Sequence, residues 1–402
     1  MSQPPPPTHG REGTPLEVFW AFLKLGLTSF GGPIAHLGYF RAEFVERRRW
    51  LDEATYVDMV ALCQFLPGPA SSQTGMMIGL SRAGYGGGLA AWLGFTTPSA
   101  IAMVLFAQEA PLLTHGVGGG WLHGLRLAAV AVVAQAVLAM ARTLAPDRAR
   151  ATMAVLAAVA VLWVASPLIQ LAVIAAGLVV GAGLLRAEGG AERPKLPIIV
   201  GPRMGAAALV VFAALLFGLP ALAAASGDHG LDLFARFYRV GSLVFGGGHV
   251  VLPLLQAEVV PPGWIKPDAF LAGYGAAQAV PGPLFTFAAY LGAAMGPAPN
   301  GWAGAAICLT AIFLPSFFLI VGVLPFWNAL RSRPRAQGAL MGANAAVVGL
   351  LGAALYNPVW TSAVTGPVDV GLVLAAFVAL TAWRAPPWLV VVASALAASF
   401  IG

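Results

Sequence analysis

The chain has 402 residues, of which 59% are hydrophobic and only 9% are charged, and its formal net charge is +6. Soluble domains carry roughly a quarter charged residues, so this composition excludes a water-soluble globule of this size. Several apolar runs approach the ~20 residues that span a bilayer. Because the basic residues lie in short loops and not on one soluble face, a nucleic-acid-binding function is excluded as well. The sequence predicts an all-α polytopic membrane protein.

The first half of the chain contains a series of turn motifs within apolar segments. Residues 1–14 are proline-rich and lack the basic and apolar start of a signal peptide, so we expect a disordered tail. An apolar segment then ends in Phe30-Gly31-Gly32-Pro33, and Trp50, Gln64 and Pro67-Gly68-Pro69 follow. Glycine permits a tight turn and proline starts a helix, so each motif predicts a helix hairpin that is broken at its tip. Such re-entrant helices occur at membrane depth only where protein or a water-filled cavity surrounds them.

The second half repeats these motifs in the same order. Its first apolar segment reaches Gly246-Gly247, and Gln278 precedes Pro281-Gly282-Pro283. Two halves with one order of motifs indicate a duplicated fold, which in membrane proteins is typical of secondary transporters. We predict a first transporter repeat over residues 15–186 and a second over residues 231–402.

The distribution of basic residues predicts that the two repeats have opposite orientations, because arginine and lysine stay on the cytoplasmic side of short loops. The Arg41–Arg49 stretch is basic, whereas its counterpart in the second half holds a single lysine. Conversely, Arg331–Arg335 is basic and its counterpart in the first half has no arginine or lysine. The inversion needs one extra crossing, which a basic linker and an apolar helix at about 204–225 supply within residues 187–230. We expect a cytoplasmic N-terminus and a C-terminus outside.

The four broken helices suggest an anion site near the middle of the membrane. A half-helix N-terminus presents free N–H groups and the positive end of a dipole. Lys24 and Arg239 occupy equivalent places before the two glycine pairs, and an ionisable group in an apolar segment is a functional candidate. Cations, dipole ends and hydroxyls suit an oxyanion better than a sodium or proton site. The candidate substrate-binding residues are Lys24, Arg239, Gly31, Gly32, Gly246, Gly247, Gln64, Gln278, Gly68, Gly282, Ser71, Ser72 and Thr286.

Each candidate also has a plainer interpretation. Lys24 or Arg239 could snorkel to the membrane interface, and Gln64 and Gln278 could cap broken helices without touching a substrate. The glycine turns could be tight loops without a ligand. Their repetition in two halves of opposite orientation favours the binding role.

Other polar residues are interpreted as structural. We interpret His36 and His249 as structural or lipid-facing, and Glu43 as part of an amphipathic interfacial surface. Cys63 and Cys308 lie in apolar segments, where a disulfide or metal site is not expected. We expect no cofactor and no metal.

At its turn motifs the chain resembles the chromate ion transporter family in its long, two-domain form. The resemblance covers residues 15–402 and is carried by Phe30-Gly31-Gly32-Pro33, Arg41–Trp50, Gln64–Pro69 and their second-half counterparts. It implies export of chromate across the bacterial inner membrane, chromate resistance and sulfate as a competing analogue. It also implies homologous halves of opposite orientation. One departure is Gly248-His249, which stands where the first half has Pro33.

We therefore predict a secondary active transporter that exports chromate, and not an enzyme. The alternative of an importer or exchanger of sulfate or another oxyanion is not excluded by the sequence, because the direction of transport follows from the coupling. A passive anion channel would conduct faster than a carrier and show no counterflow. An embedded enzyme would need clustered buried His, Cys and acidic residues, which the sequence does not show. The expected partners are chromate, sulfate and the lipid bilayer, with no nucleic acid, and a homodimer is compatible with a chain of this size.

Overall fold

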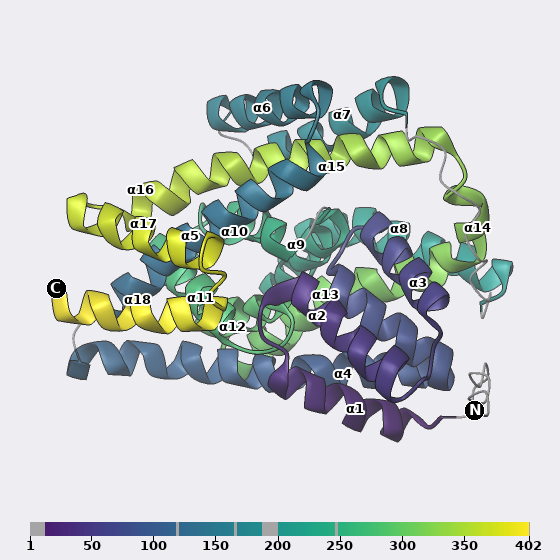
Figure 1. Cartoon of the computed structure of the whole chain (residues 1–402), viewed down its shortest axis with the longest axis horizontal. Helices are drawn as coiled ribbons and strands as arrows, with labels where there is room; N and C mark the ends of the chain where they lie inside the picture. Colours follow the sequence, from purple (N-terminus) through teal and green to yellow (C-terminus); the bar gives the residue numbers. More distant parts are fainter. Residues whose placement is uncertain (1–12, 118–119, 165–166, 187–199, 246–247, 402) are drawn as a thin grey trace.

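The computed structural model describes residues 13–117, 120–164, 167–186, 200–245 and 248–401. Regular secondary structure in these residues is entirely helical, as the composition predicts. The long helices α4 (Ala70–Val117) and α15 (Pro334–Ala354) extend along the long axis of the bundle in Figure 1, whereas α5 (Gly120–Leu144) crosses it at a steeper angle. α1 (Pro15–Thr28) begins at one end of this bundle, and α18 (Pro387–Ile401) finishes at the other.

Several helices among the described residues are long and apolar enough to cross a bilayer. These segments are Ala70–Glu109, Gly120–Leu144, Pro202–Ser226, Gly301–Leu330 and Pro334–Ala363. The outer surface carries large apolar side chains such as Leu184 and Phe217, which are 77% and 76% exposed. A surface of this kind is stable against lipid and not against water. The chain is a multi-pass membrane protein.

The two repeats contain corresponding helices in the same order. The first repeat consists of α1, α2 (Gly32–Phe40), η1 (Arg41–Arg47), α3 (Glu53–Phe65), α4 (Ala70–Val117), α5 (Gly120–Leu144), α6 (Arg148–Trp163) and α7 (Pro167–Leu184). The second consists of α9 (His229–Leu243), η2 (Gly248–Val250), α10 (Val251–Val259), α11 (Pro267–Ala279), η3 (Leu284–Thr286), α12 (Phe287–Ala294), α13 (Gly301–Val323), η4 (Leu324–Phe326), α14 (Trp327–Leu330), α15 (Pro334–Ala354), η5 (Leu355–Trp360), α16 (Thr361–Ala363), α17 (Pro367–Thr381) and α18. Between them, α8 (Pro202–Ser226) packs against α9 and α13.

Short polar side chains determine where several helices begin. Thr14, Asp52, Asp147 and Asp228 precede α1, α3, α6 and α9, and each accepts a hydrogen bond from the backbone N–H three residues later. Such N-caps satisfy an N–H group that has no partner within its own helix. The first helix of both repeats therefore starts at a capped, defined position.

The first two helices of each repeat form a hairpin. The Phe22 ring on α1 stacks on Phe44 with a centroid distance of 4.8 Å, and it contacts Phe40 edge-on at 5.4 Å. The chain must therefore reverse between α1 and α2, where Gly31 has φ of 101°. Glycine adopts this left-handed conformation without the steric cost that a β-carbon adds. In the second repeat, hydrogen bonds from Arg239 to Glu258 join α9 to α10 in the same way.

The next two helices form a second hairpin in each repeat, with its tip at the Pro-Gly-Pro motif. Gly68 and Gly282 lie at these tips, with φ of 122° and 101°. In the second repeat the Tyr290 hydroxyl on α12 donates to the Ala269 carbonyl on α11 at 2.8 Å. This contact shows that α12 returns along α11.

At the end of each second hairpin the chain bends into the long helix that follows, and two glycines lie in contact at this bend. α4 is bent at Ala83-Gly84, and a β-carbon on Gly79 would lie 2.2 Å from the Gly87 carbonyl oxygen. In the second repeat, a β-carbon on Gly292 would lie 2.2 Å from the Gly304 carbonyl oxygen. Both turns therefore depend on direct backbone contact between two glycines.

The hairpin bases of the two repeats lie at opposite ends of the bundle. Arg82, beside the bend of α4, bonds Glu17 at the base of the first-repeat hairpin. Arg126, beyond the far end of α4, pairs with Asp268 at the base of α11 at 2.8 Å. The long part of α4 separates these two contacts (Figure 1). This is the inverted arrangement that the basic residues predict. We call the two ends the α1 end and the α18 end.

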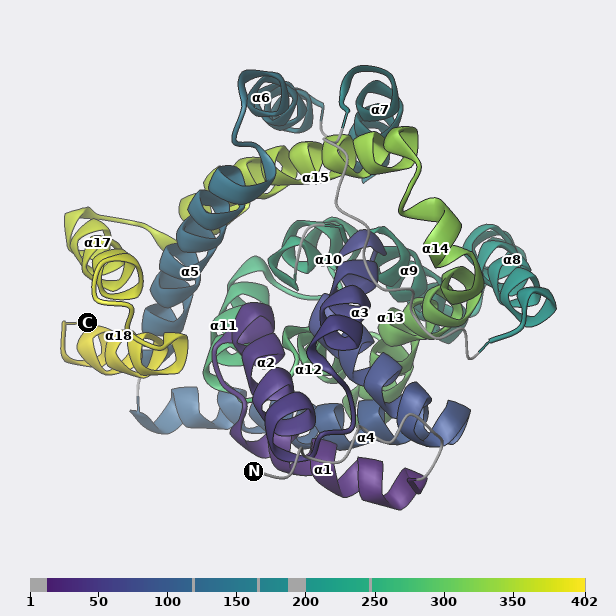
Figure 2. The ribbon, with the colours of Figure 1, turned by 45° about the vertical axis from the view of Figure 1, so that its right-hand side comes forward.

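The last two helices of each repeat pack against the other repeat. α6 and α7 lie on α15, whereas α17 and α18 lie on α5 (Figure 2). The contacts are close, because a β-carbon on Gly342 of α15 would lie 2.0 Å from the Gly177 carbonyl oxygen of α7. Similarly, a β-carbon on Gly124 of α5 would lie 2.3 Å from the Ser394 carbonyl oxygen of α18. The repeats are therefore interlocked.

Replacing either glycine at the bends tests their packing. We expect Gly79→Ala and Gly292→Ala to destabilise the protein by about 1–3 kcal/mol, because the new methyl group has no space. The measurement is the unfolding midpoint of the purified protein in detergent. Gly352→Ala is the control, since a β-carbon there would meet nothing within 4 Å. Unchanged midpoints for both bend variants would contradict the packing argument.

Candidate functional site

The tips of the second hairpins cross between the repeats. The Gly68 N–H donates to the Val244 carbonyl of the second repeat at 2.7 Å, and the Gly282 N–H donates to the Ser29 carbonyl of the first at 2.9 Å. Ser29 and Val244 are the C-cap residues of α1 and α9, so they occupy corresponding positions. Each repeat thus holds the other through the same bond at the same place. We call this arrangement the tip crossing.

Both tips need glycine because they lie against serine side chains of the other repeat. A β-carbon on Gly68 would lie 2.8 Å from Ser316 Oγ, and one on Gly282 would lie 2.7 Å from Ser99 Oγ. Ser99 and Ser316 follow proline in the corresponding long helices, α4 and α13. Gln73 Nε2 links the first tip to this surface, since it donates to the Pro67 carbonyl at 2.7 Å and to Ser316 Oγ at 3.3 Å.

Buried hydroxyl and amide groups surround the tip crossing. Ser71, Ser72 and Thr286 are 2–3% exposed. Thr286 Oγ1 donates to the Pro283 carbonyl at 2.8 Å. The Ser72 and Ser29 hydroxyls have no hydrogen-bond partner among the described residues. Because nearly all buried polar groups are hydrogen-bonded, these two hydroxyls mark a place for a further polar group.

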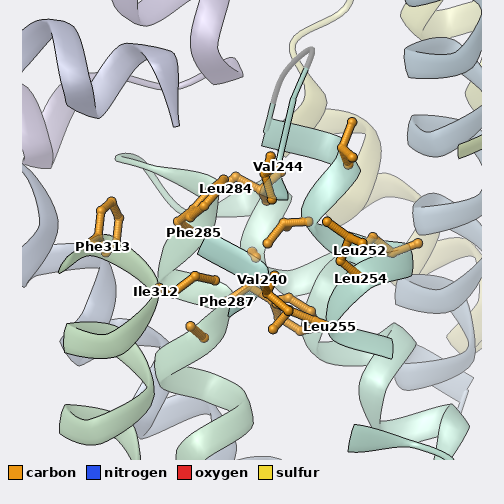
Figure 3. Packing of buried hydrophobic residues seen from close by; sticks show 14 of the residues in the cluster. Val240, Val244, Leu252, Leu254, Leu255, Leu284, Phe285, Phe287, Ile312 and Phe313 are labelled. Carbon is orange, nitrogen blue, oxygen red and sulfur yellow. The ribbon is translucent and has the colours of Figure 1, made fainter. Parts of the chain in front are cut away.

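An apolar layer lies against one side of the second tip. Leu284 and Phe285 of η3 lie beside Val244, and Phe313 of α13 lies beyond them (Figure 3). These side chains are buried. Their packing shields this side of the crossing from water, which strengthens the polar interactions there, whereas Pro281 and Gly282 stay partly accessible.

His36 lies at the tip crossing and does not face lipid, which corrects one of the two sequence interpretations. Its Nε2 is 3.2 Å from the Ser29 carbonyl and its Nδ1 is 3.4 Å from Ser71 Oγ. It therefore connects the end of α1 to the start of α4. His249 does not repeat this contact, because its Nδ1 lies 2.8 Å from the Tyr274 hydroxyl.

The remaining predicted turn residues have different surroundings. Gly32 starts α2 with φ of 77°, next to Gly31. Gly246 and Gly247 lie outside the described residues. Gln64 is exposed and lines a surface cavity of about 350 Å³ together with Arg41. Gln278 is half-buried, and its Nε2 has no hydrogen-bond partner among the described residues.

Lys24 and Arg239 lie in unlike surroundings although their positions correspond. Lys24 is exposed on the outer face of α1, on the same side as the exposed Trp20 and Leu27. Arg239 Nη2 lies 2.6 Å from both carboxylate oxygens of the buried Glu258. It also lines a cavity of about 440 Å³ beside α8 and α9. Their joint action on a substrate stays a prediction.

A charged cluster around Glu43, which the sequence analysis assigns to an interfacial surface and which the structure buries, closes the base of the first hairpin. Glu43 accepts hydrogen bonds from Arg47 Nε and Arg48 Nε, both at 2.6 Å. The Arg48 and Arg82 guanidinium groups lie 5.2 and 5.1 Å from the centre of the Trp50 ring. We call Glu43, Arg48, Trp50 and Arg82 the first ionic corner.

The second repeat has a matching cluster at the opposite end of the bundle. Glu258 bonds Arg239 and also lies 3.5 Å from Arg236 Nη1. The Arg236 guanidinium lies 4.7 Å from the centre of the Trp264 ring. We call Glu258, Arg236, Arg239 and Trp264 the second ionic corner. The signal was available in the sequence, since Glu43 and Glu258 occupy the same position in the two repeats.

Residues that could hold a metal ion do not gather at this site. Among the residues that the structure describes, no three His, Cys, Asp or Glu side chains come together as a metal-binding group. The donors at the crossing are N–H and O–H groups, which bind anions.

Comparison with known proteins agrees with the two-repeat fold. The family model described as Chromate transporter matches residues 16–182 and again residues 231–399. The chain belongs to the chromate transporter family. It is 28% identical over 379 residues to a chromate transport protein of Pseudomonas aeruginosa, which covers 92% of this chain and 87% of that protein. The resemblance at the turn motifs is thereby confirmed.

Other relatives are more distant or carry no assigned substrate. A probable chromate transport protein of Synechococcus elongatus is 26% identical over 341 residues, 83% of this chain and 82% of that protein. An uncharacterized transporter of Methanocaldococcus jannaschii is 27% identical over 323 residues, 79% and 77% of the two chains. No solved structure matches the chain.

Substitution of the tip glycines tests the crossing. We expect Gly68→Ala and Gly282→Ala each to reduce chromate transport at least roughly tenfold, because a residue forced into a left-handed conformation costs about 1–3 kcal/mol and the methyl group meets a serine hydroxyl. Uptake is measured in vesicles with matched amounts of inserted protein. Gly218→Ala on α8 is the control, since its β-carbon would meet nothing within 4 Å. Normal uptake by both tip variants would show that the crossing is not needed.

Proposed function

We propose that the protein is a secondary active transporter that exports chromate from the cytoplasm across the bacterial inner membrane. The observation that carries the proposal is the tip crossing, in a chain that belongs to the chromate transporter family. In transporters with inverted repeats, substrate sites lie at the repeat interface where broken helices end. Two relatives that align with most of this chain are named as chromate transport proteins or probable ones.

The donors around the crossing fit a tetrahedral dianion. Chromate offers four oxygen acceptors, and the start of α4 offers backbone N–H groups together with the partnerless Ser72 hydroxyl. Ser71 adds a hydroxyl from the first repeat, whereas the Thr286 hydroxyl donates to the Pro283 carbonyl and becomes available to a substrate only when that bond breaks. The Gly68 and Gly282 N–H groups are already bonded across the crossing, so they become available to a substrate only when a tip moves.

Alternating access can operate by opening one tip at a time. Breaking the bond from Gly68 to Val244 would release the first-repeat tip while the bond from Gly282 to Ser29 holds the second, and the reverse step would open the other side. The two ionic corners lie at opposite ends and close the bases of different hairpins. Each corner is thus suited to loosen in one of the two states.

The basic residues support a cytoplasmic location for the α1 end. Arg82 and Arg331 both lie there, since Arg82 bonds Glu17 at the base of α1 and Arg331 pairs with Asp58 of α3 at 2.6 Å. Arginine is retained on the cytoplasmic side of short loops. On this assignment the N-terminus is cytoplasmic and the C-terminus is outside.

The test is chromate uptake into everted membrane vesicles, with and without a proton gradient and with sulfate as competitor. We expect uptake that requires the gradient and that sulfate inhibits, because both anions are tetrahedral dianions and N–H and O–H donors separate them poorly. Sulfate uptake without chromate uptake would move the function to a sulfate carrier. Uptake that needs no gradient and shows no counterflow would indicate a passive channel.

A single hydroxyl tests the location of the substrate. We expect Ser72→Ala to raise the KM for chromate roughly tenfold or more, because a hydrogen bond to a charged group contributes about 1.5–3 kcal/mol. Ser81→Ala, on the same helix, is the control, since its hydroxyl donates to the Ile78 carbonyl away from the crossing. Equal KM values for the two variants would place the substrate elsewhere.

The predicted cation pair is tested separately. If the two cations act on the substrate as the sequence predicts, Lys24→Ala and Arg239→Ala should each remove most chromate uptake while insertion stays intact, although Lys24 is exposed on the outer face of α1. Arg239→Lys keeps the charge but loses the two-oxygen contact with Glu258, so it separates the two contributions. Full transport by both alanine variants would remove the pair from the site.

A further inference from the structure

We propose that a groove at the α1 end binds the headgroup of an anionic phospholipid. The groove has a volume of about 1000 Å³ and is lined by Arg186, which follows α7, and by Arg333 and Arg335 at the start of α15. α7 belongs to the first repeat and α15 to the second. The site is therefore complete only where the two repeats meet.

The three arginines are not neutralised by neighbouring acids within the described structure. All three are exposed, and no described carboxylate forms an ion pair with them. Other arginines at the same end differ, because Arg48 bonds Glu43 and Arg331 bonds Asp58. Three like charges around one groove attract an anion, and a phosphodiester matches the planar guanidinium group.

The surroundings favour a lipid over a soluble anion. α7 runs from the groove into the membrane with an outward apolar face, on which Val179 and Leu184 are 73% and 77% exposed. Leu185 and Leu330 also line the groove itself. A lipid can place its phosphate on the arginines and its acyl chains along this face. Basic pockets between membrane helices on the cytoplasmic side bind anionic headgroups in this way.

Beside the groove, direct backbone packing holds α7 against α15. A β-carbon on Gly181 of α7 would lie 2.3 Å from the Gly338 carbonyl oxygen of α15, and one on Gly338 would lie 2.3 Å from the Leu185 carbonyl oxygen. These contacts fix Arg186 relative to Arg333 and Arg335, so the positive site is already formed before a ligand binds. A bound headgroup would connect the repeats at this end.

The test measures unfolding midpoints of the purified full-length protein in mild detergent, with added cardiolipin, phosphatidylglycerol, phosphatidylcholine or inorganic phosphate. We expect the two anionic lipids to raise the midpoint by several degrees, and phosphatidylcholine and phosphate to leave it unchanged. In the double variant Arg186→Gln/Arg335→Gln, the lipid-induced shift of the unfolding midpoint should fall to less than half of the wild-type shift. The control is the double variant Arg142→Gln/Arg148→Gln, which removes the same amount of charge outside the groove and should keep the full shift of the midpoint.

Native mass spectrometry of the same samples counts bound lipid independently of stability. Retention of anionic lipid by the wild type and the control, with loss from the Arg186/Arg335 variant, supports the site. Equal lipid retention and equal midpoint shifts in all three proteins would overturn it. A shift produced by inorganic phosphate alone would overturn the lipid assignment in favour of a soluble anion. None of these outcomes depends on chromate transport.

Discussion

Two backbone hydrogen bonds at the tip crossing hold the repeats of this protein together. In each bond a glycine N–H at a hairpin tip donates to the C-cap carbonyl of a helix in the other repeat. A buried N–H or carbonyl that loses its partner is costly, so neither tip moves alone without compensation. Since the two bonds are chemically the same, states that break one or the other differ little in backbone energy. A small energy difference between two conformations is what the proposed alternating access requires.

Several other features of the fold serve this crossing. On both α4 and α13, a serine that follows proline lies against the tip of the other repeat. The tip fits there only because it is glycine. Buried apolar residues such as Phe285 and Phe313 pack on one side of the second tip (Figure 3). The ionic corners hold the hairpin bases, far from the tips, where charged groups can reach the membrane surface. The polar interactions thus divide between a neutral centre and two charged ends.

The sequence predicts the helical class, the turns and the inversion, because these follow from local properties. The Gly-Gly and Pro-Gly-Pro motifs predict hairpin tips from backbone conformation alone, and the basic residues predict on which side of the membrane a loop lies. It does not predict which face of a helix packs inward. α1 is apolar around much of its surface, so nothing local places Lys24 outside and Phe22 inside. The burial of His36 and the pairing of Arg239 with Glu258 likewise depend on contacts between separate helices.

The exchange of helices between the repeats bears on how such a chain is assembled. The last two helices of each repeat pack on a helix of the other repeat: α6 and α7 on α15, and α17 and α18 on α5. The glycine contacts there leave no room for side chains. A polypeptide carrying one repeat alone would expose a long apolar helix and two unpaired arms. It would need a second repeat inserted in the opposite direction to cover them. The N-terminal half of the chain must therefore remain incompletely packed in the membrane until the C-terminal half has been inserted.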